Sequence, residues 1–341
     1  MRVVIRDFRA DERAVASTVG TIMALLVFLT FLSVIVNQYV PTWMTDSEAS
    51  HMNSALGQFG GVKGAVDLQM LAAQAAKDAN SFQIPVTTAT AVTLGVDGVP
   101  IFAGPTPGTL VLNPDAGKFN LTVAYVIPPN PTSCTGTGTR RWANDTSSGS
   151  LALSVANRYY TQQQLAYENG AVIRYQTDGQ FIRVHPTFSV VSSNNTLDIS
   201  FALVSLYGKG IVTGTTAEMV STELFAFDRQ DYSCFPSTNG FVWIEHTSPY
   251  GLAWYRFLNQ TLSDSLKLGG TSIHTPFDES FTAKIGATSI YRVSYTYNPI
   301  TQSYLVRLVV YNNPGVMTLG FFRLQHGQVQ AGIGDATQQV F

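Results

Sequence analysis

Charged side chains are scarce in this chain of 341 residues. Lys, Arg, Asp and Glu together make up 12% of it, about half of the roughly 25% found in an ordinary soluble domain. The net charge is −2, so the basic footprint of a nucleic-acid-binding protein is missing, and we expect no nucleic acid among the partners. A neutral surface rich in Ser, Thr, Asn and Tyr is instead typical of secreted β-proteins.

The motifs of enzymes and metal sites are also missing. Histidine occurs at positions 51, 185, 246, 274 and 326, and none has a partner at the spacing of metal ligands. The sequence contains no H-E-x-x-H, no G-x-S-x-G, no phosphate-binding loop and no EF-hand ladder. We therefore predict no catalytic residue, no metal and no cofactor. An ectoenzyme acting on glycans is the least favoured alternative, because no paired catalytic carboxylates stand in a readable motif.

The longest stretch without formal charge runs from Ala14 to Thr45. About 20 apolar residues cross the ~30 Å hydrocarbon core of a bilayer as a helix, so residues 15–44 are predicted to span a membrane. A secretory signal peptide has a shorter apolar run that ends in small residues. Here the run is followed by Tyr39 and Trp43, which suit the headgroup level. A helix buried in a soluble protein is less favoured, because such helices are rarely apolar all round.

The charges on either side of this segment predict its orientation. Arginines at positions 2, 6, 9 and 13 precede it, whereas the first basic residue after it is Lys63. Basic flanks stay cytoplasmic. The N-terminus is therefore expected inside the cell and residues 45–341 outside, with residues 15–40 in contact with lipid.

An amphipathic stalk helix is predicted over residues 45–80, ended by Ile84-Pro85. Its apolar positions recur three and four residues apart: Met52, Ala55, Phe59, Val62, Val66 and Met70. Four glycines between residues 57 and 64 weaken the helix or permit close helix approach. The pattern fits a helix lying on the C-terminal domain and also a stalk that joins neighbouring subunits.

Residues 81–341 are predicted to form a β-rich, sandwich-like head. The stretch 197–204 alternates apolar and polar side chains, as a strand with one buried face does. Hairpins are predicted about residues 298–301 and 177–179. A second lobe is suggested near Arg229, where an aromatic-rich stretch follows.

The stretch 129–150 is predicted as a long low-complexity loop. Loops of this kind often carry binding, and Arg140, Arg141 and Trp142 are suited to a surface glycan or an acidic surface. The alternative is a solvated loop tied down by Cys134.

Two features fit an extracytoplasmic compartment. The only cysteines are Cys134 and Cys234, which we predict to form a disulfide or else to be unrelated buried thiols. Four Asn-x-Ser/Thr sequons are candidate N-glycosylation sites: Asn120, Asn144, Asn194 and Asn259.

A basic leader, an uncut apolar helix and a β-rich head together resemble archaeal type IV pilins and pilin-like proteins with a class III signal peptide. The local match lies in the stretch DERAVASTVGTI, residues 11–22. In that family a prepilin peptidase cuts after a basic residue followed by Gly or Ala. The resemblance implies a cut at Arg13-Ala14 that leaves Val15 first, or one at Arg9-Ala10 that leaves Asp11 first. Residues 1–14 would then be the leader.

The resemblance implies a membrane-anchored structural subunit that packs into a pilus-type filament. Its partners would be the prepilin peptidase and other pilin-like subunits or copies of itself, and its head would serve adhesion or form the filament surface. The alternative is a permanently anchored surface binding protein that does not polymerise.

Overall fold

The fold is that of a computed structural model, which describes residues 8–127 and 138–334, with side chains from residue 17 onward. The helical elements are α1 (Phe8–Val34), a π-helical turn (Ile35–Tyr39), α2 (Val40–Asp78) and α3 (Gly251–Leu266). The strands in the first half of the chain are β1 (Thr88–Thr93), β2 (Gly108–Asn113), β3 (Lys118–Ile127), β4 (Thr139–Ser147), β5 (Ser150–Val155), β6 (Gln163–Glu168), β7 (Ala171–Gln176), β8 (Gly179–Val184) and β9 (Phe188–Ser193). The remaining strands are β10 (Thr196–Tyr207), β11 (Gly210–Gly214), β12 (Ala217–Tyr232), β13 (Gly240–Ser248), β14 (Gly270–His274), β15 (Asp278–Ile285), β16 (Thr288–Asn298), β17 (Ser303–Asn312) and β18 (Thr318–Ile333).

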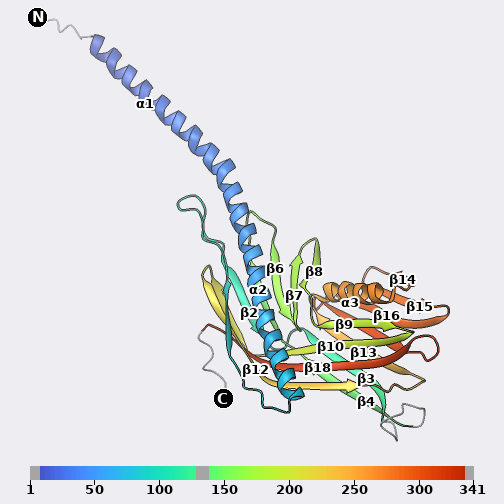
Figure 1. The fold of residues 1–341 in the computed structure, drawn as a ribbon. Coiled ribbons are helices and arrows are strands. Elements are labelled where there is room, and N and C mark those ends of the chain that lie inside the picture. Colours follow the sequence, from blue (N-terminus) through green and yellow to red (C-terminus); the bar gives the residue numbers. More distant parts are fainter. Residues whose placement is uncertain (1–7, 128–137, 335–341) are drawn as a thin grey trace, which may run out of the picture.

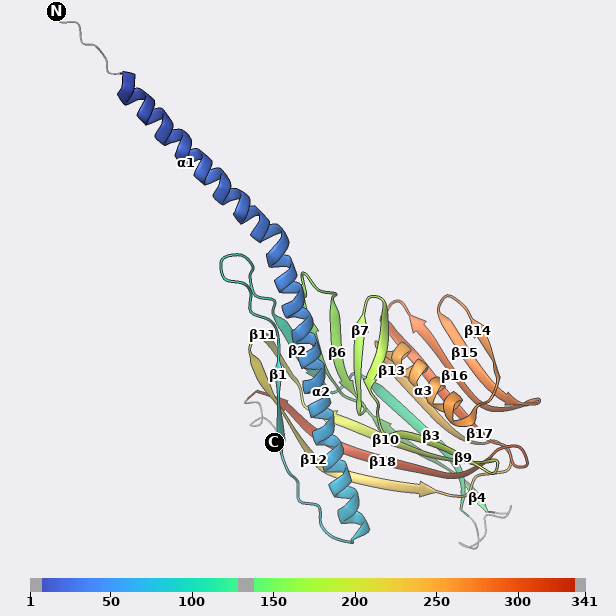
Figure 2. The same cartoon turned by 45° about the horizontal axis from the view of Figure 1, so that its top comes forward.

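A long N-terminal helix followed by a β-rich head forms the molecule, as the sequence predicts. Figure 1 shows α1 projecting away from the head, while α2 lies against the sheets. The turned view agrees: α1 stays clear of the strands and α2 crosses in front of β2, β12 and β18 (Figure 2). The head therefore packs only on the C-terminal half of the helical rod.

Three sheets build the head. A five-stranded sheet has the order β1-β12-β18-β10-β9, a six-stranded sheet β11-β2-β5-β6-β7-β8, and a seven-stranded sheet β14-β15-β16-β17-β13-β3-β4. Neighbours are antiparallel except for β10 and β18, which pair in parallel. The predicted hairpins form as β16–β17 and β7–β8. A sandwich-like arrangement of several sheets is thus confirmed.

Two apolar cores hold the layers together, and β10 lies between them. Phe201 and Leu203 belong to the core that includes α3 and the seven-stranded sheet. Val204 and Leu206 belong to the core shared by α2, the five-stranded sheet and the six-stranded sheet. The predicted single buried face holds from Leu197 to Phe201, where Asp198 is exposed. It fails from Ala202 onward, where layers cover the strand on both sides.

The stalk helix ends at Asp78, two residues before the predicted end at residue 80, because Asn80 adopts a left-handed conformation (φ 49°) that stops helical bonding. Two further predictions need correction. Part of the expected loop 129–150 is strand β4, which pairs with β3. Arg229, near which a second lobe was suggested, lies inside the continuous strand β12.

Helix α3 replaces strand in a region where the sequence suggested strands throughout. Its buried side chains Trp254, Leu258 and Leu262 stand four residues apart and face the larger core. Lys267, in the left-handed region at φ 52°, ends the helix.

Candidate membrane anchor and its attachment to the head

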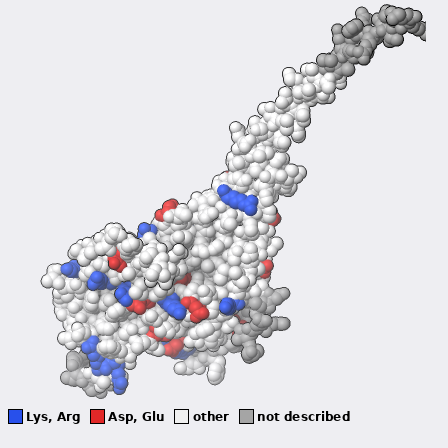
Figure 3. All heavy atoms as spheres, turned by 180° about the vertical axis from the view of Figure 1, so that it is seen from behind, with Lys and Arg blue, Asp and Glu red and all other residues white. Residues whose placement is uncertain are grey.

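The first half of the helical rod is long and apolar enough to span a membrane. A helix from Ser17 to Asp78 contains an 18-residue window that is strongly apolar and 0% buried against the rest of the chain. It is the one such helix in the part of the chain that the structure describes. Large side chains such as Phe28 and Phe31 stand in the open, Phe31 with 66% of its surface exposed. On the face seen in Figure 3, the described part of the rod beyond the head carries no charged side chain.

The exposed apolar surface of α1 requires an environment other than water. Each large apolar side chain gains about 1.5–3 kcal/mol when it is removed from water, and ten of them are exposed from Val19 to Val34. The backbone hydrogen bonds of a helix are satisfied internally, so the segment is stable in hydrocarbon. The helix thus suggests membrane anchoring.

A change of helical pitch marks the exit from the apolar segment. The N–H of Val40 bonds to the carbonyl of Ile35, five residues back, and Pro41 follows in the first turn of α2. Pro41 has no N–H to offer Asn37, so the wider turn accommodates a break in the normal bonding. The rod changes direction at this point (Figure 1). Tyr39 and Trp43, with ring centroids 6.0 Å apart, are exposed beside it.

A buried carboxylate fixes the upper end of α2 to the head. Glu48 is fully buried and its oxygens accept four hydrogen bonds. The donors are the N–H groups of Arg158 (3.1 Å), Tyr159 (2.9 Å) and Tyr160 (2.7 Å) and the hydroxyl of Thr106 (2.9 Å). Burial alone would raise the pKa of Glu48, but these donors outweigh it and hold the pKa below its ordinary value of 4.5. We call this arrangement the Glu48 clamp.

The inner face of α2 continues the attachment downward. The predicted apolar stripe from Met52 to Met70 is buried against both neighbouring sheets. Gln69 adds polar contacts, donating to the carbonyls of Thr222 (3.0 Å) and Val86 (3.1 Å). His51 lies close to the carbonyl of Thr93 (3.0 Å), and burial lowers its pKa more than this contact raises it.

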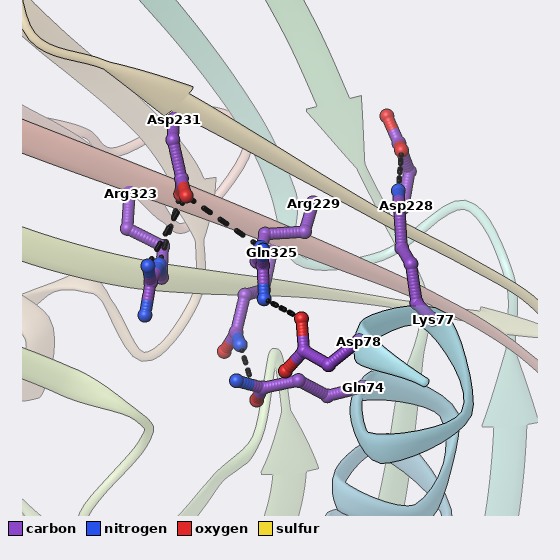
Figure 4. Close-up of polar contacts among 8 residues, drawn as sticks. All are labelled: Gln74, Lys77, Asp78, Asp228, Arg229, Asp231, Arg323 and Gln325. Carbon is purple, nitrogen blue, oxygen red and sulfur yellow. Dashed lines mark hydrogen bonds and ion pairs between the residues drawn. The ribbon is translucent and has the colours of Figure 1, made fainter. Parts of the chain in front are cut away.

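Ion pairs fasten the lower end of α2 to β12, and a hydrogen bond between Gln74 and Gln325 joins it to β18 (Figure 4). Lys77 contacts Asp228 at 2.7 Å, and Arg229 contacts Asp78 at 2.6 Å. Hydrogen bonding from Lys77, first among several causes, lowers the pKa of Asp228. These side chains are partly exposed, so each pair contributes only about 0–1 kcal/mol. The buried Glu48 clamp therefore matters more to the attachment than this cluster.

A second buried carboxylate joins the layers of the head. Glu168 on β6 receives hydrogen bonds from Trp254 of α3 (3.0 Å) and Ser248 of β13 (2.9 Å). Nε2 of His246 lies 2.9 Å from the same carboxylate, off the ideal hydrogen-bond direction, and its Nδ1 lies 3.1 Å from the carbonyl of Lys118. Both ring nitrogens thus face oxygen atoms. Glu168 and His246 are both 0% exposed, so the pair is structural.

The predicted processing residues lie at the start of the rod. The backbones of Arg9, Ala10 and Asp11, and of Arg13, Ala14 and Val15, all lie in α1. Cleavage at either position stays a prediction.

The remaining predicted sites fall on the head. Cys234 is nearly buried, and Cys134 lies outside the described residues, so their disulfide stays a prediction. Three of the four predicted sequon asparagines are exposed, and Asn259 is half-buried on α3. No group of three His, Cys, Asp or Glu suited to a metal occurs among the residues with described placement.

Sequence reasoning missed both buried carboxylates. Glu48 and Glu168 carry no local signal, because their partners lie 58 to 112 and 80 to 86 residues away along the chain. No protein-family model, no curated protein and no solved structure matches this chain.

Proposed function

We propose that this chain is a pilin-like structural subunit of the archaeal cell surface. Its N-terminal helix anchors it in the membrane and packs into the core of a pilus-type filament. The head lies outside the cell, where it forms the filament surface or serves adhesion. The observation that carries the proposal is the exposed, charge-free helix that continues without a loop into the stalk of a β-rich head.

A helix of this kind has two environments open to it, lipid and a bundle of identical helices. The arginines at positions 2, 6, 9 and 13 hold the N-terminus on the cytoplasmic side. Their removal by a prepilin peptidase deletes the anchor that opposes extraction from the bilayer. Cleavage then acts as the switch that permits assembly.

The outward face of α2 supports close packing between subunits. Gly57, Gly60 and Gly64 have open space where a side chain would begin, and small residues of this kind let helix backbones approach closely. Leu68 and Leu71 extend the same rod as exposed apolar side chains. The charged residues Glu48 and Lys63 point into the head instead.

The N-terminal residue of the protein purified from its native cells tests the proposal. We expect Val15, or Asp11 if the alternative site is used. Arg13→Glu should abolish cleavage and recovery in filaments, while the matched Arg9→Glu leaves both unchanged. A protein that retains residues 1–14 would instead be the permanently anchored surface binding protein. Unchanged cleavage in Arg13→Glu together with loss in Arg9→Glu would move the site to Arg9-Ala10.

A further inference from the structure

An aromatic surface lies on the outer face of the seven-stranded sheet, where β4, β3 and β13 run side by side (Figure 2). The register places Thr122 of β3 between Asn144 of β4 and Trp243 of β13. Side chains one position away, such as Leu121 and Ile244, point into the core. Alternation along the strands therefore gives this sheet a second face, on which Asn120 and Asn144 are exposed.

A hollow of about 460 Å³ is formed on this face, within the range of small-ligand sites. It is lined by Asn120, Thr122, Trp142, Asn144, Phe241, Trp243 and Glu245. We call it the aromatic hollow.

Three rings make its floor and wall. Phe241 lies 6.5 Å from Trp142 and 6.2 Å from Trp243 between ring centroids. The guanidinium of Arg140 lies over the ring of Trp142, 5.7 Å from its centroid. Trp142 nevertheless keeps 63% of its surface exposed and Trp243 keeps 38%. Two indoles held in place but open to solvent are costly to the isolated chain, and such patches mark binding sites.

The polar groups of the hollow are free to bind. The side chains of Asn120, Thr122 and Asn144 hydrogen-bond to no residue in the described ranges. Their amides and hydroxyl offer donors and acceptors along one edge of the rings. Glu245 is paired with Arg307 at 2.9 Å, so its carboxylate is fixed and its charge is balanced.

We propose that the aromatic hollow binds a neutral carbohydrate. A sugar ring presents an apolar face of C–H groups and a rim of hydroxyls. The indoles match the face, and the unpaired amides match the rim. The balanced charge of Glu245 disfavours a strongly ionic ligand, and a shallow patch of this size lacks the area of a stable protein interface. The proposal deepens the adhesive role of the head and rests on the head being outside the cell, but it does not depend on filament assembly.

Binding is measured on the full chain, purified in a detergent without a sugar headgroup, because an alkyl glycoside would compete for the site. Cellohexaose, chitohexaose and mannohexaose are titrated by calorimetry and tryptophan fluorescence. We expect saturable binding of at least one of them. Trp142→Ala and Trp243→Ala should each weaken it about tenfold or more, as loss of an aromatic anchor does. Trp43→Ala, which removes an exposed indole from the rod, serves as the matched control and should leave affinity unchanged.

The absence of saturable binding to all three sugars would overturn the proposal, and so would binding that both head variants leave unchanged. The two sequons in the hollow provide an independent check. Mass spectrometry of the native protein should find Asn120 and Asn144 unmodified. An N-glycan on either residue would mean that the protein's own sugar fills the hollow. None of these results depends on the N-terminal cleavage that tests the filament subunit.

Discussion

Removal of the Glu48 carboxylate should loosen the head from its stalk. Oε1 of Glu48 accepts hydrogen bonds from Thr106 and Arg158, and Oε2 accepts them from Tyr159 and Tyr160. In Glu48→Ala all four donors lose their acceptor. A hydrogen bond to a charged group contributes about 1.5–3 kcal/mol, but water reaches some of these partly exposed donors. If two donors stay unsatisfied, the expected loss is about 3–6 kcal/mol.

The Glu48→Gln variant sharpens the test. Its amide keeps one acceptor oxygen and places an NH₂ group against the other pair of donors. The loss should therefore be close to that of Glu48→Ala, whereas a merely steric role for Glu48 predicts almost no loss. Asp46→Asn, an exposed acid two residues away, is the matched control and should stay within about 0.5 kcal/mol of the unaltered protein.

Hydrogen exchange of the full chain in detergent measures the loss of these hydrogen bonds at the donor amides themselves. The backbone amides of Tyr159 and Tyr160 are the donors, so their exchange should accelerate about 100-fold or more in both Glu48 variants. Urea unfolding of the same samples reports the global loss through the transition midpoint. Exchange at these two amides that matches Asp46→Asn would refute the assignment of Glu48 as a clamp.

Other consequences follow from the same structure. The pKa of Glu48 is depressed in the folded protein. The stabilisation by its carboxylate is therefore complete at pH values above the ordinary pKa of 4.5 and is lost as the pH falls through the lower folded pKa. Urea midpoints between pH 6 and pH 3 should fall more steeply in the unaltered protein than in Glu48→Gln. Glu168→Gln removes one of the two carboxylate oxygens that accept hydrogen bonds from Trp254 and Ser248. It should cost about 1.5–3 kcal/mol by the same assay, while an equally stable variant would contradict a structural role for this carboxylate. Leu26→Arg places a charge in the anchor at a cost of about 2.5–3.5 kcal/mol, so alkaline carbonate should extract more of this variant from native membranes. Arg229→Ala breaks the partly exposed ion pair with Asp78 at the lower end of α2. It should reduce the free energy of unfolding, measured in urea, by less than about 1 kcal/mol. A larger loss would show that these ion pairs, not Glu48, dominate the attachment.

The helical rod was readable from the sequence because its signals are local. A charge-free run, a basic flank and apolar positions three and four residues apart describe one element without reference to the rest of the chain. The predicted end of the rod, residue 80, lies two residues beyond the observed end at Asp78. Pro85 is a strong local stop, but Asn80 ends the helix earlier through its backbone conformation, and only a mild preference of asparagine signals this.

Elements that depend on distant layers were harder to predict. The four-residue spacing of Trp254, Leu258 and Leu262 was a usable helix signal, but it lay in a stretch where aromatic residues favour strands. For β10, alternation predicted one buried face, and nothing local announces that α2 and the six-stranded sheet cover the other.

The residues of the aromatic hollow could be predicted from the sequence only in part. Trp142 stood out as an aromatic beside two arginines, and a glycan was a reasonable partner for it. Its neighbours Phe241 and Trp243 lie about 100 residues further along the chain and meet it only because β13 pairs with β3, and β3 with β4. The sequence shows which side chains are present, whereas the order of the strands in the sheet determines which of them lie together. A strand that was expected to be a loop supplies the rigid backing that a carbohydrate platform requires, since a loop would give up part of the binding energy to fix the indoles in place.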